Sequence, residues 1–301
     1  MSIAEPANYI GFRLTIGVQS LRTLDSDKCY NFRTSMNSLS DRPKVSVIIP
    51  SFNQGQFLEA SIRSVLEQDY PNLETIVVDG GSKDESVEVI KKYQDRLTWW
   101  VSEKDKGHAD ALNKGFSHAT GEILAWLNSD DIYFPSAVSE AVALLKEHPE
   151  VGMVYGDADL IDDAGETIGQ FGSKQTSYRQ MLRGSVHIPQ ATTFFRADRW
   201  RQVGPLDLSL FFSFDYDLWV RLAKVSQLLY VPKRWAKFRI HGAGKTIVND
   251  DRCYPDMLRV LEREGGSWFS WLRLRMITRK VLYSWLPWKF RLRVRKALTF
   301  K

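Results

Sequence analysis

Short apolar segments alternate with amphipathic ones from residue 45 to residue 155, and this alternation restricts the chain to an α/β fold. The first strand is predicted over Val45–Ile49, a β-branched run that Pro50 ends. The other predicted strands are 74–78, 97–102, 123–127 and 152–155, and the predicted helices are 57–68, 85–93, 109–118, 136–147 and 214–225. Strands that alternate with helices predict a mainly parallel sheet, Rossmann-like, flanked by helices.

Polar clusters follow three of these strands where each strand ends. They are Ser51 with Asn53, Asp79 with Ser82, and Asp130 with Asp131. In open α/β sheets, ligands bind at the carboxyl ends of the strands. We therefore expect the three clusters to line one crevice.

Two adjacent carboxylates, Asp130 and Asp131, stand directly behind an apolar strand. Like charges this close repel each other unless a cation lies near them, and Mg²⁺ or Mn²⁺ prefers oxygen ligands that it shares with substrate phosphates. An Asp pair can also cap the helix that follows from Ser136. The second acidic strand end at Asp79 favours the metal.

The turn Asp79–Ser82 contains two glycines, which let the backbone approach a ligand closely. Its Asp can accept a hydrogen bond from a nucleobase N–H or a ribose hydroxyl. A plain strand-to-helix turn, capped by Ser82 or Asp84, explains the same residues equally well.

Taken together, several segments resemble the nucleotide-binding half of the inverting family 2 glycosyltransferases, which have the GT-A fold. These segments are Val45–Asn53, Ile76–Asp84, Gly107–Gly115 and Gly121–Asp131. Asp215–Leu222 resembles the family's acceptor-side helix, and Arg239–Thr246 resembles its closing segment. The resemblance implies a GT-A domain over 43–250, preceded by an extension over 1–42 and followed by a basic helical tail over 251–301.

The resemblance also implies roles for single residues. Asp215 would be the general base, and Asp130 would bind a divalent metal, Mn²⁺ or Mg²⁺, with Asp131 supporting it or facing the donor sugar. His241 would close over the diphosphate, in contact with phosphate or with the metal. A solvent-exposed loop histidine is the alternative for His241. The residues implied at the nucleotide sugar are Pro50, Ser51, Asn53, Asp79, Gly81, Ser82, Asn113, Ser129 and Asp131. The candidates for the acceptor side are His187, Gln190, Asp217 and Trp219.

The expected reaction is a single displacement at the anomeric carbon with inversion, which needs a base at the acceptor and a cation at the departing diphosphate. Asp215 and Asp217 are two apart on a helix and so do not share a face; we assign the base to Asp215, with Asp217 as the alternative. The chain departs from the family at Asn128, where Asp is frequent in the metal motif, and at Phe214, where Glu often precedes the base.

Two other functions are consistent with the pattern. A nucleotidyltransferase would use a similar sheet and metal, but the segment Pro50–Gly55 lacks the basic residue that such enzymes usually carry after the first strand. A nucleotide-sugar-binding protein without catalysis would tolerate Asn128 and Phe214.

The tail differs in charge from the rest of the chain. Residues 268–301 hold ten Lys or Arg and no Asp or Glu, and removing these ten charges from the net +5 leaves −5 for residues 1–267. Basic residues and Trp at helical spacing suit an anionic membrane surface, although a helix packed on the domain with its basic face in solvent is the alternative. The acidic remainder of the chain argues against nucleic acid.

The expected partners are a nucleotide-sugar donor and a sugar or lipid-linked acceptor, in cell-surface polysaccharide or glycolipid synthesis. The two cysteines, Cys29 and Cys253, suit a reducing compartment. No apolar run reaches the ~18–20 residues of a spanning helix, and the start lacks a signal-peptide pattern. We therefore expect a cytoplasmic protein, peripheral on the inner face of the cell membrane.

Overall fold

The computed structural model describes residues 38–183, 188–242, 253–266, 273–274 and 277–278. All of them belong to one compact unit, Ser35–Lys301. Most of the expected extension over 1–42 and most of the basic tail lie outside the described residues. No helix in the described part is long and apolar enough to cross a membrane.

Four parallel strands form the first part of the sheet, in the order β3-β2-β1-β4. Their bounds are β1 Val45–Ser51, β2 Leu73–Asp79, β3 Trp99–Ser102 and β4 Ile123–Trp126. The connecting helices are α1 Gly55–Leu66, α2 Ser86–Tyr93 and α3 His108–His118, with the 3-10 turn η2 Gln94–Arg96 after α2. Because Ser51 pairs with Asp79 and Asp79 with Ser102, these strands end level with one another. Their carboxyl ends form one edge of the sheet, and this is the edge meant below.

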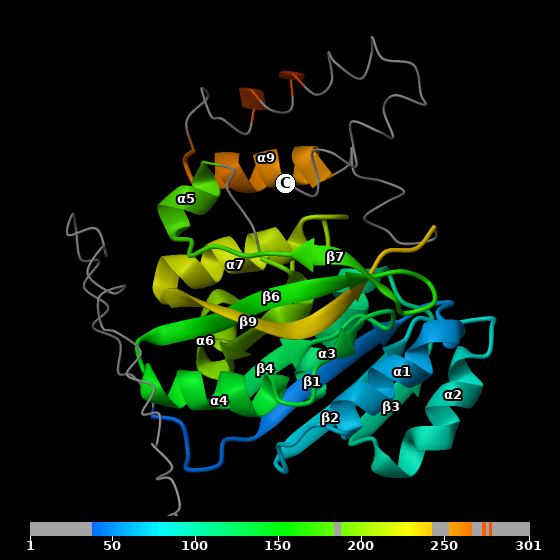
Figure 1. Ribbon diagram of the computed structural model, residues 1–301. Coiled ribbons are helices and arrows are strands. Elements are labelled where there is room, and N and C mark those ends of the chain that lie inside the picture. Colours follow the sequence, from blue (N-terminus) through cyan, green and yellow to red (C-terminus); the bar gives the residue numbers. More distant parts are fainter. Residues whose placement is uncertain (1–37, 184–187, 243–252, 267–272, 275–276, 279–301) are drawn as a thin grey trace, which may run out of the picture. The chain divides into compact units, whose positions relative to one another are not determined.

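The sheet continues as β4-β8-β6-β9-β5, with β7 paired to β6, and here its pairings are mixed (Figure 1). These strands are β5 Ile132–Tyr133, β6 Val151–Ile161, β7 Thr167–Phe171, β8 Thr193–Arg196 and β9 Gln227–Arg239. The other helices are α4 Ala137–Glu147, α5 Tyr178–Leu182, η3 Gln190–Thr192, α6 Ala197–Val203, α7 Phe214–Val225 and α9 Cys253–Arg263.

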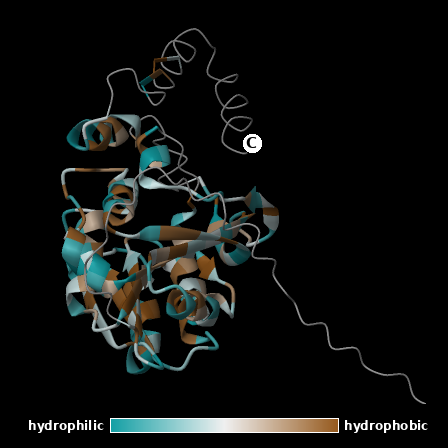
Figure 2. Ribbon diagram, turned by 90° about the vertical axis from the view of Figure 1, so that its left-hand side faces the viewer, coloured by the Kyte–Doolittle hydropathy of each residue, from teal (hydrophilic) through white to brown (hydrophobic). Residues whose placement is uncertain are grey.

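Apolar side chains are buried on both faces of the sheet. Along β1, Val47 and Ile49 pack with residues of α1 and α4, whereas Ile48 packs with residues of α3 and α7. A strand covered on both faces has a nearly continuous apolar run, which is why Val47, Ile48 and Ile49 of β1 follow one another without polar alternation. Figure 2 shows hydrophobic residues gathered along the strands and hydrophilic ones on the outer turns.

The structure confirms the α/β class and the predicted strands and helices between 45 and 155 to within a few residues. The sheet is less parallel than expected, because β8 runs antiparallel to both β4 and β6. The sequence did not predict β9, which lies between β6 and β5.

Candidate functional site

The turn after β2 is organised by the carboxylate of Asp79. This side chain is fully buried, and one oxygen accepts the main-chain N–H groups of Gly81 and Ser82 at 3.1 and 2.9 Å and the Ser102 hydroxyl at 2.7 Å. The other oxygen accepts the Ser82 hydroxyl at 2.5 Å. Asp79 therefore shapes the turn from beneath. Its expected role as a contact of the nucleobase stays a prediction.

The segment after β1 is tied to the same turn. The main-chain N–H of Asn53 donates to Ser82 Oγ at 2.8 Å, and Asn53 Oδ1 accepts the N–H of Lys83 at 2.9 Å. Asn53 has a φ of 51°, in the left-handed region that asparagine tolerates better than most residues. Pro50 and Ser51 end β1 beside it, so the structure brings this predicted cluster together.

Oxygen atoms without hydrogen-bond partners among the described residues lie near this edge. They include the buried Ser51 Oγ, Gln54 Oε1, Asn128 Oδ1 and Gln190 Oε1. Ser51 ends β1, Asn128 follows β4 on the neighbouring strand, and Gln190 donates its amide N–H to the Trp126 carbonyl at 2.7 Å. Buried polar atoms are seldom left unpaired, so this edge is suited to a polar ligand.

The loop after β4 brings a carboxylate and an imidazole together. Asp130 Oδ2 lies 2.9 Å from His241 Nε2, and the histidine is buried against the ring of Phe57 with ring centroids 4.9 Å apart. The two residues predicted as metal ligands, 111 positions apart, therefore meet. No group of three or more His, Cys, Asp or Glu in the described residues could hold an ion by itself.

Asp131 points the other way. Its carboxylate is buried and accepts the main-chain N–H of Arg239 at 3.0 Å and the Asn128 side-chain amide at 3.3 Å. Burial, reinforced by the charge of Asp130, raises the pKa of the Asp131 carboxyl well above its usual range. Asp131 thus supports the loop from within, and Ser129 beside it is buried as well.

A buried arginine that the sequence analysis did not single out holds this loop. Arg239 Nε donates to the Asp130 carbonyl at 3.0 Å, and its Nη1 donates to the carbonyls of Asp162 and Asp163 at 2.7 and 3.0 Å. Its guanidinium also lies 4.5 Å from the centroid of the Phe57 ring. One side chain thus joins the loop after β4, the β6–β7 turn and α1.

The first turn of α7 lies at the same edge. The rings of Phe214 and His108, the first residue of α3, are 5.1 Å apart. Trp219 of α7 stacks on Trp126 of β4 at 5.2 Å, which joins the strand before the Asn128–Asp131 loop to the helix that carries Asp215. Asp215 is half-buried, and its Oδ1 accepts the N–H of Tyr216 at 2.7 Å.

A family model described as glycosyl transferase family 2 matches residues 46–199, half of the chain, including β1, β2, β4 and their loops. The chain belongs to glycosyltransferase family 2.

Similar proteins agree with this membership. An uncharacterized glycosyltransferase of Rickettsia typhi is 31% identical over 77% of this chain and 72% of its own length. One from Mycobacterium tuberculosis strain H37Rv is 31% identical over 68% of this chain and 79% of its own length.

Solved structures share the fold of this glycosyltransferase. The 1–349 fragment of S. aureus TarS in complex with UDP-GlcNAc has a TM-score of 0.61 at 18% identity, covering 73% of this chain and 66% of that one. The mannosyltransferase PcManGT from Pyrobaculum calidifontis, in complex with GDP-Man and Mn²⁺, has a TM-score of 0.60 at 20% identity, covering 80% and 71%. This chain spans 39% of the longer TarS structure.

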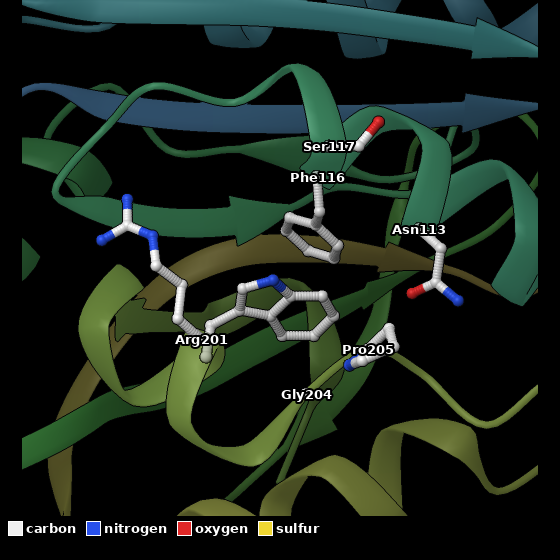
Figure 3. A pocket seen from close by; sticks show the side chains of 7 residues that line it. Asn113, Phe116, Ser117, Arg201, Gly204 and Pro205 are labelled. Atoms are coloured by element: carbon white, nitrogen blue, oxygen red, sulfur yellow. The ribbon is translucent and has the colours of Figure 1, made fainter.

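Three predicted site residues of this glycosyltransferase make their observed contacts within the fold. Asn113 uses both ends of its amide on the main chain of Leu206, at 2.9 and 2.8 Å. It lines a cavity of about 280 Å³ between α3 and α6, where Figure 3 shows its amide beside Pro205. Asp217 is fully buried in ion pairs with Arg221 and Arg263, and Trp219 is buried in the core.

Other residues reach the site without having been predicted. A Cβ on Gly80 would lie 2.6 Å from Asp105 Oδ2, so the Asp105 side chain in the loop after β3 lies directly against the β2 turn. Phe52 is largely exposed beside Gly80. The predicted acceptor residue His187 lies outside the described residues.

Proposed function

We propose that this glycosyltransferase moves a sugar, with inversion and with the help of a divalent metal, from a nucleoside diphosphate sugar to an acceptor hydroxyl. The observation that carries the proposal is the meeting of Asp130 and His241 at the edge where β1, β2 and α7 also converge. The fold neighbours that hold UDP-GlcNAc and GDP-Man support a donor of the same class.

The residues at this edge fit a divalent cation. Asp130 supplies a carboxylate, His241 an imidazole, and Asn128 an unpartnered buried oxygen. These residues would hold the cation together with phosphate oxygens of the donor and water. The bound metal would stabilise the charge of the departing diphosphate as a Lewis acid. Asn128 carries no charge, so we expect lower metal affinity than an aspartate would give.

The chain's own residues account for the other requirements. Ser51 and Asn53 line the end of β1 for the nucleoside, with Gly81 and Ser82 in the neighbouring turn. Asp215 takes the proton of the acceptor hydroxyl as the new bond forms. Its half-buried carboxylate stands at the start of α7, on the side of the site where we expect the acceptor to bind. Gln190, with an unpartnered amide oxygen, is placed to receive a hydroxyl of the acceptor or donor sugar.

The test is donor binding and turnover by the full chain. UDP- and GDP-sugars with Mn²⁺ should raise the melting temperature by mass action, and the protein should hydrolyse the bound donor slowly without acceptor. Asp130→Asn should keep nucleotide binding and lose the additional shift caused by Mn²⁺, whereas Asp163→Asn, in the neighbouring β6–β7 turn, should behave as wild type. If no nucleoside diphosphate shifts the melting temperature, the proposal is wrong. Binding without turnover would favour a protein that kept the fold and lost catalysis.

We base the proposed acceptor and the proposed location of the protein on the basic sequence of the tail. A cytoplasmic protein whose residues 268–301 bind the inner membrane surface would meet lipid-linked acceptors of polysaccharide or glycolipid synthesis. Because of its tail, the full chain should cosediment with anionic vesicles at low salt and not with neutral vesicles. Equal binding to both kinds of vesicle would contradict this part of the proposal.

A further inference from the structure

The helix α9 lies beyond the residues that the family model matches, and it packs against α7, the helix that begins one residue before Asp215 (Figure 1). In the sequence it follows His241 by about a dozen residues and reads as the start of the tail. Its contacts are concentrated on the segment around the candidate base.

The first anchor is Asp256, which is only 3% exposed. Its Oδ2 accepts the main-chain N–H of Phe212 at 2.7 Å and that of Ser213 at 3.4 Å. Ser213 occupies the N-cap position of α7 and donates its hydroxyl to the Cys253 carbonyl at 3.0 Å. The start of α9 therefore holds the two residues that lead into α7.

The second anchor is Arg263 at the other end of α9. It pairs with Asp217, which is fully buried and also receives Arg221 Nε at 2.9 Å. The next residue, Glu264, accepts the Tyr178 hydroxyl at 3.0 Å and Lys224 Nζ at 2.8 Å. Asp215 thus lies between two points at which α9 fixes the chain.

We propose that α9 is part of the acceptor side of the active site and that Asp256 is a positioning residue for Asp215. The proposal rests on the function proposed above. A general base works only within hydrogen-bond reach of the proton it takes, and a displacement of ~1 Å can cost as much as ~10²-fold in rate. Asp256 fixes the main chain two to three residues before the base, so it sets where the base stands.

The experiment compares Asp256→Ala with Asp256→Asn in the full chain. Alanine removes the acceptor of the two N–H groups, and we expect kcat to fall ~10–100-fold while the Kd of UDP or GDP with Mn²⁺ stays unchanged. Asparagine keeps a carbonyl oxygen in the same place, so it should restore most of the rate. Glu262→Ala, on an exposed part of α9, is the matched control and should leave kcat unchanged.

A merely structural role predicts a different outcome. If Asp256→Ala lowers donor affinity and kcat by the same factor, or if asparagine is no better than alanine, α9 stabilises the domain without positioning the base, and the inference is overturned. Should Asp256→Ala fail to fold, Ser213→Ala removes one hydrogen bond of the same anchor and should still lower kcat with the Kd unchanged; an unchanged kcat would overturn the inference. A wild type that turns over no donor refutes the proposed function itself, whereas an active wild type with an equally active Asp256→Ala refutes only the positioning role.

Discussion

The donor side and the acceptor side of this site are built in different ways. On the proposed donor side, the bonds of Asp79 to Gly81 and Ser82 are local, two and three residues on, but Asp130 meets His241 from 111 positions away. On the proposed acceptor side, Ser213 is held by Cys253, 40 positions away, and Asp217 by Arg263, 46 positions away. The donor side therefore combines local turns with contacts between strand ends, whereas these acceptor-side bonds join one helix to another.

This difference implies a division of labour that mutation can test. Changes on the acceptor side should affect the chemical step and spare donor binding. Changes on the donor side should affect nucleotide and metal binding first. Residues that contact both sides should affect both properties, and residues that contact neither side should affect neither.

The largest effect should come from Asp215→Asn. The amide keeps the shape and cannot accept the proton, so we expect kcat to fall by ~10²–10⁴-fold, with the nucleotide Kd unchanged. Steady-state transfer rates and calorimetric nucleotide titrations measure the two quantities. Asp207→Asn, in the loop before α7, serves as the control. Loss of nucleotide binding in Asp215→Asn would break the division between the two sides.

A smaller effect is expected from Arg239→Lys, because Arg239 supports a loop that is far from it in the sequence. Arg239 belongs to β9, yet its side chain supports the Asp130 loop. Lysine keeps the charge and loses the planar fork that reaches three carbonyls, so we expect Mn²⁺ affinity to fall ~10–100-fold, the usual range for residues that orient metal ligands.

Titration of Mn²⁺ in the presence of UDP or GDP measures this affinity. Arg234→Lys is the matched control, because Arg234 lies on the same strand with a largely exposed side chain. An unchanged metal affinity in Arg239→Lys would show that the loop holds its shape through its own turn alone.

The smallest effect on activity should come from Glu74→Gln at the amino end of the sheet. Burial raises the pKa of Glu74, but hydrogen bonds from Ser46, Thr120 and Lys44 outweigh burial and hold the pKa below its ordinary value. A lowered pKa in the folded state stabilises the fold above the ordinary pKa of a glutamate, and this stabilisation is lost as the pH falls through the lowered value.

Urea unfolding at several pH values should therefore show wild type losing stability on acidification more steeply than Glu74→Gln. At neutral pH the variant should be less stable by about 1–3 kcal/mol, with kcat and nucleotide Kd unchanged. If the stability of wild type and of Glu74→Gln changes equally with pH, Glu74 does not have a lowered pKa in the folded protein.

The same contrast explains what the sequence could predict. The strands from β1 to β4 and their loops are visible because apolar periodicity and polar strand ends are local signals, and Asp130 and His241 followed from the family resemblance. The roles of Arg239 and Asp256 and the contacts of Asn113, Asp217 and Trp219 depend on segments far apart in the sequence, which periodicity does not reveal. Asp79 was predicted for the turn in which it lies, but its bonds to the main chain of that turn were not predicted, because a carboxylate that accepts ligand N–H groups accepts main-chain N–H groups equally well.

The position of β9 in the sheet determines how late the site can be completed while the chain is being synthesised. Because β9 inserts between β6 and β5, a nascent chain on the ribosome has a divided sheet until its last third is made. His241 follows this strand by two residues, so the imidazole reaches Asp130 only as the gap closes. The proposed cation site is therefore complete only after β9 has been made, and a fragment that ends before this strand lacks the His241 imidazole.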